Sequence, residues 1–303
     1  LLVFIKSSGV NVNVDNLEDT LTTFIERNPG VNYKFYLVID EGLKDFVESY
    51  FKDTDLLFDL KITDNSWAHD FNEFFSNHTD DSEWLLVCHD DVYFVTHDWF
   101  KKITAPLLSK KEELGWVTST SEYYYKYENK VITDTFRPGF HLDHKNWGAM
   151  WQLHKCRINR EDGKVLDVDY PKYPVKIHGP MSAVMLTPME SMKKIGPCAD
   201  WTQYTMLVDE DWSLEALRNN LWNVWVPDVH HLHPSRKALR KENNRWQKEA
   251  HEGFAKKWGF LPSLAVFKEG GSPSLAELRE KYSDTNIAWS SYRNSYDWER
   301  FGD

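Results

Sequence analysis

Cysteine is scarce in this sequence of 303 residues, which holds only Cys88, Cys156 and Cys198. The number is odd, the spacing is wide, and no C-x-x-C pair occurs. These features argue against a disulfide framework and against a structural zinc site built on cysteine. We therefore expect a reducing compartment, the cytoplasm, as the location of the protein.

Long apolar runs and basic stretches are scarce as well. No apolar run approaches the roughly 20 residues that a helix needs to cross a bilayer, so we predict no transmembrane segment, although peripheral contact with a membrane stays open. The net charge is −11, and no long basic run occurs. Proteins that bind DNA or RNA normally present a basic face, so we expect no nucleic-acid partner.

Hydrophobic and aromatic residues, in contrast, are plentiful. The hydrophobic fraction of 41% is enough for the core of one large α/β domain or of two ordinary domains. The chain contains 14 Trp, 14 Tyr and 17 Phe. Many of these rings must fill the core, but Trp and Tyr on a surface also suit the apolar faces of sugar rings. The aromatic content is therefore compatible with a saccharide ligand without identifying one.

The first 90 residues alternate between apolar strands and amphipathic helices. Strands are predicted at 1–7, 33–40, 57–63 and 84–87, and helical stretches at 15–27, 43–51 and 71–75. This order is typical of a mostly parallel sheet with helices on both faces, whose ligands lie at the carboxyl ends of the strands. Asp40 and the run His89-Asp90-Asp91 follow two of these predicted strand ends.

The second half of the chain is less regular. Residues 119–173 are rich in Tyr, Asp, Lys and Asn, and we interpret them as an irregular or antiparallel insertion beside the site. We predict a strand at 175–187, interrupted at Gly179-Pro180, and another strand at 221–228. Helices are predicted at 188–196 and 209–220, and a long charged helix at 238–258. We divide the chain into a domain of residues 1–268, with halves at 1–118 and 119–268, and a C-terminal extension of residues 269–303.

Two adjacent carboxylates, Asp90 and Asp91, end the fourth predicted strand together with the imidazole of His89. An unpaired charge at the end of a core strand would cost several kcal/mol, so these groups need partners. Mg²⁺ and Mn²⁺ often use only one or two protein carboxylates together with waters and phosphate oxygens. The pair therefore fits a metal site, and the alternative is that one Asp caps the next element while the other is solvated.

Three acidic residues, Asp209, Glu210 and Asp211, begin the predicted helix at 209–220. Acidic residues are favoured at helix N-termini by the macrodipole, which is the structural explanation. Three in a row exceed what a cap needs, however. A carboxylate at this place could accept a proton from a hydroxyl group as a general base.

Three histidines, His230, His231 and His233, follow the end of the predicted strand at 221–228. Neutral imidazole is a good ligand for Mn²⁺ or Zn²⁺. In an extended chain the side chains of residues 231 and 233 would share a face. Arg236 and Lys237 come next and could receive a phosphate group.

Taken in order, these clusters resemble the GT-A fold of nucleotide-sugar glycosyltransferases, most closely the large inverting family 2 type, over about residues 1–260. The run HDDV is similar to the Asp-x-Asp metal motif in a His-x-Asp-Val variant. Further segments similar to family motifs are LVIDEG, WAHDFN, GPMSAVMLTPMESMKKIG, DEDWSLEALRNN, VWVPDVHHLH and FAKKWG. The resemblance implies an α/β fold of the GT-A (Rossmann-like) type with an acceptor-side insertion.

The resemblance also implies a role for individual residues. Asp91 would be the metal carboxylate with His89 in place of the first acid, a departure that leaves the second metal contact open. Asp211 would be the base, with Glu210 as its neighbour. The further metal ligands would be His233 and His231. The residues expected to contact the nucleotide sugar are Asp40, Lys6, Asn72, Asp90 and Arg236.

The activity implied by the resemblance is an inverting, single-displacement transfer. A nucleoside diphosphate sugar would be the donor, Mn²⁺ or Mg²⁺ would be the cofactor, and the acceptor would be a hydroxyl group of a saccharide or glycoconjugate. The insertion at 119–173 and either Trp201 or Trp212 could hold that acceptor.

Other classes of protein share parts of this pattern. A metal-dependent hydrolase, such as a phosphoesterase or deacetylase, could use the same Asp and His clusters. A nucleotidyltransferase would normally carry a glycine-rich loop with a basic residue after its first strand, and KSSGVNVN is a poor match to it. A non-catalytic sugar-binding module would explain the aromatic residues but not the ordered acidic ones.

Overall fold

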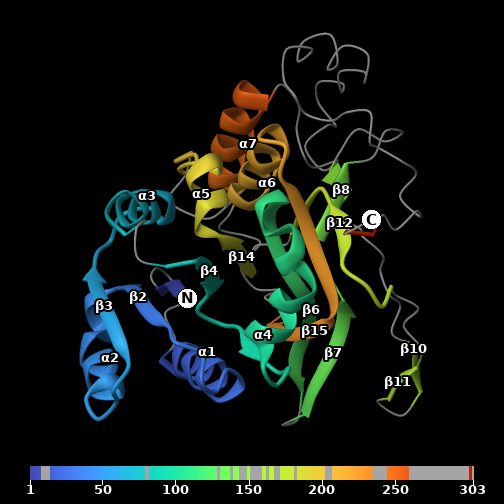
Figure 1. The fold of residues 1–303 in the computed structure, drawn as a ribbon. Helices are drawn as coiled ribbons and strands as arrows, with labels where there is room; N and C mark the ends of the chain where they lie inside the picture. Colours follow the sequence, from blue (N-terminus) through green and yellow to red (C-terminus); the bar gives the residue numbers. More distant parts are fainter. Residues whose placement is uncertain are drawn as a thin grey trace.

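The computed structural model describes residues 1–7, 14–78, 82–127, 130–136, 139–142, 149–150, 159–161, 164–166, 171–180, 183–201, 207–234, 244–258 and 300–301. Within these ranges the chain forms one large sheet covered by helices on both faces, together with smaller antiparallel pairs (Figure 1).

The large sheet has ten strands, eight of which follow the order β12-β15-β6-β14-β4-β1-β2-β3, while β5 pairs with β15 and β7 with β6. Strands β4, β1, β2 and β3 are parallel to one another, and β15 is parallel to β6, whereas β14 is antiparallel to both β4 and β6. The bounds of the ten strands are β1 Leu2–Ser7, β2 Lys34–Ile39, β3 Leu57–Ile62, β4 Trp84–His89, β5 Tyr93–Phe94, β6 Leu114–Tyr127, β7 Lys130–Phe136, β12 Val175–Ile177, β14 Val184–Pro188 and β15 Trp222–Pro234.

Two smaller sheets complete the strands of the described residues. One contains β8 (Gly139–Leu142), β9 (Ala149–Met150) and β13 (Gly179–Pro180), and the other contains β10 (Asn159–Glu161) and β11 (Lys164–Leu166). Every pair in these two sheets is antiparallel. The described parts of the segment at 119–173 therefore include the antiparallel structure that we expected there, although its first residues extend the central strand β6.

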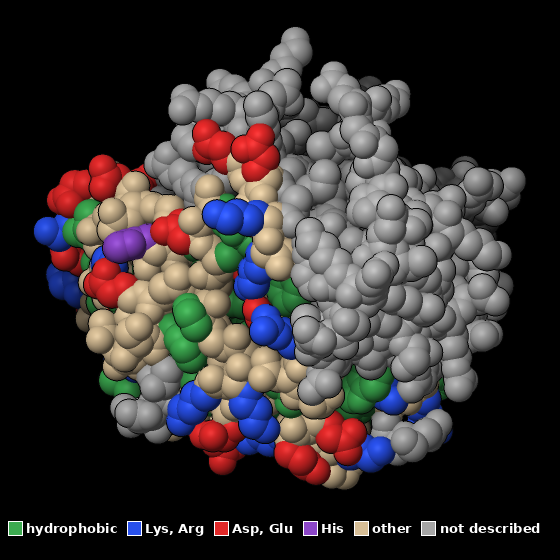
Figure 2. All heavy atoms as spheres, turned by 90° about the horizontal axis from the view of Figure 1, so that it is seen from above, with side chains coloured by type: hydrophobic (Ala, Val, Ile, Leu, Met, Phe, Trp, Pro, Cys, Tyr) green, Lys and Arg blue, Asp and Glu red, His purple; other side chains and the backbone are tan. Residues whose placement is uncertain are grey.

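The helices form a layer on each face of the large sheet (Figure 1). One layer contains α1 (Val14–Arg27), η1 (Glu41–Leu43), α2 (Lys44–Phe51), α4 (Trp99–Thr104) and η2 (Ala105–Glu113). The opposite layer contains α3 (Trp67–Asn77), α5 (Met189–Ile195) and α6 (Val208–Arg218), with α7 (Asn244–Trp258) packed outside α6. Seen from above, the described surface carries acidic and basic side chains interspersed with small hydrophobic areas (Figure 2).

The apolar pattern of the sequence explains this layering. Successive side chains of a strand point to opposite faces, so Val3 and Ile5 of β1 pack toward α1, while Leu2 and Phe4 pack toward α3. Helix α1 meets that face with residues at helical spacing, namely Leu17, Leu21 and Phe24. The same rule builds two hydrophobic cores, one on each side of the sheet.

The predicted α/β class with a largely parallel sheet and helices on both faces is confirmed. One local prediction was wrong: the histidine cluster does not follow the end of a strand but lies inside β15, which continues to Pro234. Pairing with β6 extends the strand, because residues 230–234 pair with residues 120–124 beyond a register shift. No element was predicted for α4 and η2, which cover the sheet beside β15 and β6.

Candidate active site

His89, Asp91 and His233 converge at one edge of the sheet. Each offers one ligand atom, and these three atoms lie within 4.8 Å of one another. The Nδ1 atom of His89 lies 3.3 Å from Nε2 of His233. That Nε2 lies 3.3 Å from Oδ1 of Asp91. Asp91 is 3% exposed, whereas the two imidazoles are partly exposed, so the cluster opens toward solvent through the histidines.

The strand β5 explains how residues so distant in sequence meet. It begins two residues after Asp91 and pairs with β15 through His231 and Leu232, which carries Asp91 to the neighbourhood of His233. Helix α1 fixes the same loop. Thr20 and Thr23 accept hydrogen bonds from the backbone N–H groups of residues 92 and 94, at 3.0 and 3.1 Å.

Two imidazoles and one carboxylate form a donor set that suits a divalent cation. Imidazole nitrogen favours Mn²⁺, Zn²⁺ and similar ions, while carboxylate oxygen also suits Mg²⁺. Among the described residues, these three side chains could hold such an ion, because one ligand atom of each lies within 4.8 Å of the other two. His89, Asp91 and His233 are three of the four metal ligands that we expected from the sequence.

His231, the fourth expected ligand, lies in the core beside these three. Its Nδ1 atom lies 2.7 Å from Oγ of Ser119, which also accepts a hydrogen bond from Nε1 of Trp99 at 3.2 Å. Burial, and then the neighbouring histidines, lower the pKa of His231 well below its ordinary value, so the ring is neutral. These contacts join β15 to β6 and α4, and the expected metal role of His231 stays a prediction.

Asp90 turns away from the metal cluster. Oγ of Ser7, at the end of β1, donates a hydrogen bond of 2.6 Å to Oδ2 of Asp90. The two adjacent acids thus have partners on different strands, Asp90 on β1 and Asp91 on β15. Asp90 lies at the carboxyl end of parallel strands, where a donor contact is expected.

Helix α7 holds Asp211 in a fully buried position on α6. The Oδ1 atom accepts a hydrogen bond from Nε1 of Trp258 and pairs with Nζ of Lys257, both at 2.7 Å. The Oδ2 atom accepts a bond of 3.3 Å from the backbone N–H of Ala199. Burial raises the pKa of the Asp211 carboxyl above its ordinary value, against the lowering effect of Lys257 and Trp258.

Asp209 and Glu210, which precede Asp211 on α6, are also buried and interact with each other. Burial, and then the charge and hydrogen bond of Asp209, raise the pKa of Glu210 well above its ordinary value, which favours a neutral Glu210. Leu207, the buried residue that precedes the helix, has a φ of 61° in the left-handed region. Such strain at a non-glycine residue is common at functional sites, because surrounding structure has to maintain it.

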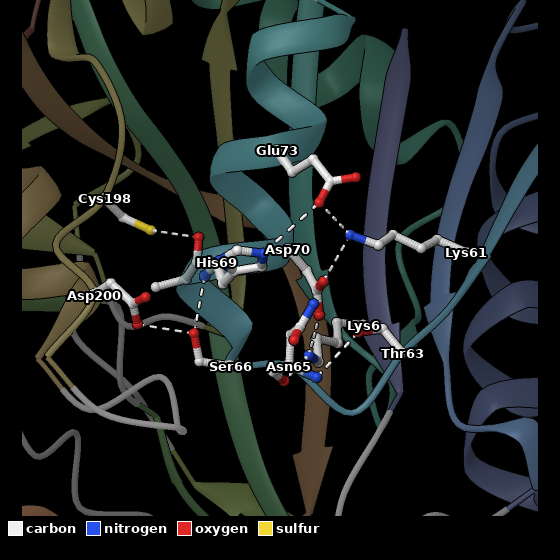
Figure 3. A network of polar contacts seen from close by, with 11 residues as sticks. Lys6, Lys61, Thr63, Asn65, Ser66, His69, Asp70, Glu73, Cys198 and Asp200 are labelled. Carbon is white, nitrogen blue, oxygen red and sulfur yellow. Dashed lines mark hydrogen bonds and ion pairs between the residues drawn. The ribbon is translucent and has the colours of Figure 1, made fainter.

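Lys6 and Asn72, two expected donor contacts, have partners within the protein. Nζ of Lys6 donates to Oδ2 of Asp70 at 2.5 Å and to the backbone oxygen of Asn65 at 2.7 Å, as Figure 3 shows. Asn72 exchanges two hydrogen bonds of 2.9 Å with the backbone of Cys198. These hydrogen bonds fix Lys6 against α3 and join α3 to Cys198, and direct contact with a donor stays a prediction for both residues.

Asp40 follows β2 directly and precedes η1, so it lies at the carboxyl end of a parallel strand as expected. Arg236 and Lys237 lie outside the described residues.

Asp70, which the sequence reasoning missed, is the buried partner of Lys6 and also pairs with Lys61 at 2.9 Å. Two signals could have indicated it: a lysine inside the apolar first strand, and an acid at the buried helical spacing of α3.

The two tryptophans expected near the acceptor differ in exposure. Trp212 is 1% exposed and stacks on Trp116 in the core, so the expectation that it could hold an acceptor was wrong. Trp201 is half-buried and lies against α7, where a Cβ atom at Gly253 would come within 2.4 Å of the indole. Phe254 meets the same indole edge-on, with ring centroids 5.6 Å apart.

Among the described residues, no helix combines the length and the apolar character that crossing a bilayer requires. No protein-family model matches the sequence, and no curated protein sequence matches it.

Solved structures do match the chain. One of them is a crystal structure of GalNAc-T7 with UDP, GalNAc and Mn²⁺, with a TM-score of 0.58 and 12% sequence identity. The match covers 93% of this chain and 55% of that chain, so this chain spans about half the length of its neighbour. At this identity the likeness concerns the fold alone, and it confirms the α/β fold of the GT-A type.

Proposed function

We propose that this chain is a metal-dependent glycosyltransferase that moves a sugar from a nucleoside diphosphate sugar to a hydroxyl group of a saccharide or glycoconjugate. The convergence of His89, Asp91 and His233 at the carboxyl edge of a GT-A sheet carries this proposal. The neighbouring structure with this fold contains UDP and Mn²⁺, which supports a nucleotide and a divalent cation as ligands of the present chain.

We assign different roles in donor binding to the residues at the carboxyl edge of the sheet. His89, Asp91 and His233 would hold the cation, and their two imidazoles favour Mn²⁺ over Mg²⁺. When bound, such a cation stabilises the negative charge of a departing diphosphate. The donor contacts proposed beside it are Asp40, Asp90, Lys6, Asn72 and Arg236.

Asp211 would act as the general base. It would accept the proton of an acceptor hydroxyl that attacks the anomeric carbon from the face opposite the diphosphate, and a single displacement of this kind inverts the configuration. Burial raises the pKa of Asp211, which suits a carboxylate that has to take up a proton. Glu210, its buried neighbour, adds little negative charge because its own pKa is raised further.

A thermal-shift experiment tests the proposal without knowledge of the acceptor. The chain is melted with UDP, GDP and dTDP, each with and without Mn²⁺. A ligand that binds only the folded state at 100 times its dissociation constant stabilises it by about 2.7 kcal/mol. We expect one nucleotide to raise the melting temperature only together with Mn²⁺. If every nucleotide gives the same melting temperature with and without Mn²⁺, the proposal is wrong.

The change Asp211→Asn tests the assigned base. We expect this variant to keep Mn²⁺-dependent nucleotide binding. The rate of sugar transfer should fall about 10²–10⁴-fold, the usual contribution of a general base. Glu215→Gln is the matched control, because Glu215 lies on the same helix and also pairs with Lys257, at 2.9 Å. Transfer at the wild-type rate by Asp211→Asn would show that another group accepts the proton.

A metal-dependent hydrolase is the second candidate, and the metal cluster itself favours it. Two imidazoles and one carboxylate are also the ligand set of catalytic zinc sites, which hold their metal without help from the substrate. Metal analysis after extensive dialysis separates the two functions. Stoichiometric zinc together with cleavage of phosphoesters or acetylated sugars would favour the hydrolase, whereas weakly bound, exchangeable Mn²⁺ would favour the transferase.

A further inference from the structure

The two oxygens of Asp211 are engaged unequally. Oδ1 receives two short contacts, from Nε1 of Trp258 and Nζ of Lys257, each 2.7 Å long. Oδ2 receives one long bond of 3.3 Å, from the backbone N–H of Ala199. A carboxylate oxygen can accept at least two hydrogen bonds, so Oδ2 keeps the larger capacity to accept a proton.

Lys257 is the cation that pairs with Asp211 among the described residues. Its Nζ lies 2.7 Å from Asp211 and 2.9 Å from Glu215, and Glu215 has a second cationic partner in Arg218, at 3.6 Å. The lysine side chain is 31% exposed, whereas Asp211 is fully buried. The other titratable groups near Asp211 are Glu210 on α6 and the buried thiol of Cys198, both with a raised pKa, and neither supplies a positive charge.

We propose that Lys257 is a positioning residue for sugar transfer, which fixes Oδ1 of Asp211 and leaves Oδ2 to receive the proton of the acceptor. This inference rests on the proposed function. In the step concerned, the acceptor oxygen forms the new bond to the anomeric carbon and its proton passes to Oδ2. The bond between that carbon and the diphosphate oxygen breaks, and the electron pair leaves with the diphosphate.

A purely structural ion pair between α6 and α7 is the alternative, and the two roles differ in their pH dependence. Burial raises the pKa of Asp211 and Lys257 opposes this effect. Without the lysine, the carboxyl would take up a proton at a higher pH and would cease to be a base there. A lysine that only joins two helices would change stability but not the pH at which transfer begins.

The experiment compares Lys257→Met with Lys257→Arg, and uses Lys256→Met as the control because Lys256 is the exposed neighbour on the same helix. The first readout is carbon-13 NMR of the aspartate carboxyl groups, in which the Asp211 resonance is identified by its loss in Asp211→Asn. We expect Lys257→Met to raise the pKa of Asp211 by about one unit, the lower end of the effect of a close opposite charge. Lys257→Arg and Lys256→Met should leave it close to the wild-type value.

The second readout is the pH profile of nucleoside diphosphate release from UDP-sugar donors with Mn²⁺. Its acidic limb should move upward in Lys257→Met by the same amount and should be restored in Lys257→Arg. If Lys257→Met does not fold, Lys257→Gln removes the charge with less loss of polar contact and replaces it in both measurements.

The outcomes distinguish this inference from the function on which it rests. An unchanged carboxyl titration, or an unmoved acidic limb in an active enzyme, would overturn the role of Lys257 alone. Wild-type protein that transfers no sugar from any donor would overturn the proposed function, and a shifted titration would then describe only a structural ion pair.

Discussion

Asp91→Asn should weaken Mn²⁺ binding at least about 100-fold, more than the 10–100-fold effect of losing a hydrogen-bond partner of a metal ligand. The amide supplies a neutral oxygen in place of the only carboxylate of the cluster, between His89 and His233. Because the cation would hold the donor through its diphosphate, Mn²⁺-dependent nucleotide binding should disappear as well. Electron paramagnetic resonance of free Mn²⁺ measures the first effect, and the thermal shift with UDP measures the second.

Asp90→Asn is the matched variant for this measurement, since it makes the same chemical change one residue earlier. Asp90 accepts its hydrogen bond from Ser7 and lies outside the three-residue cluster. We expect it to keep Mn²⁺ binding, whatever its effect on the nucleotide. Equal loss of Mn²⁺ binding in both variants, or undiminished binding in Asp91→Asn, would contradict the assignment of the metal site.

The metal cluster shows which part of a site can be predicted from a sequence. His89 and Asp91 follow an apolar run, and the rule that ligands lie at the carboxyl ends of parallel strands locates them. His233 is far away in the chain, and only the resemblance to a family of known order connected it with them. The pairing of β5 with β15, which brings the three together, involves a strand of two residues and left no periodic signal.

His231 and Trp212 show why a sequence pattern does not determine what surrounds a side chain. His231 and His233 share a face of β15, so their pattern predicted the same role for both. Their contacts differ, because His231 contacts the hydroxyl group of Ser119 on β6 while His233 lies near Asp91. Trp212 failed for a related reason: its position among acidic residues indicated a site, but its helical spacing with Val208 and Ala216 turns the ring into the core.

Buried acidic side chains near the carboxyl edge of the sheet are paired with other polar side chains. A charge that leaves water needs a partner, and three buried acids have one: Asp91 has the histidines, Asp211 has Lys257, and Asp70 has two lysines. The pairs of Asp70 with its two lysines are structural supports, whereas the pair of Asp211 with Lys257 belongs to the proposed base. The histidine–carboxylate cluster differs from them, because the partners of Asp91 are imidazoles that could hold a metal ion and are partly exposed.

Asp70→Asn should destabilise the fold by about 3–5 kcal/mol, the usual effect of removing one partner from a buried ion pair. Asp70 is fully buried, and its loss leaves Lys6, whose side chain is 4% exposed, without a negative partner. Burial pushes the pKa of Asp70 upward, but hydrogen bonds from Lys6 and Lys61 outweigh it and lower the pKa below its ordinary value. Urea unfolding followed by circular dichroism measures the difference at neutral pH.

The sign of this pKa shift fixes how the effect depends on pH. A carboxyl whose pKa is lowered by folding stabilises the protein fully above its unfolded pKa, and this contribution is lost as the pH falls through the lower, folded value. The gap between wild type and Asp70→Asn should therefore be widest near neutrality and shrink below about pH 4. Asp59→Asn is the matched control, since Asp59 and its partner Lys34 are each 39% exposed and an exposed pair contributes about 1 kcal/mol or less. Equal losses in both variants, or a gap that does not narrow in acid, would show that the Lys6–Asp70 pair is not what holds β1 against α3.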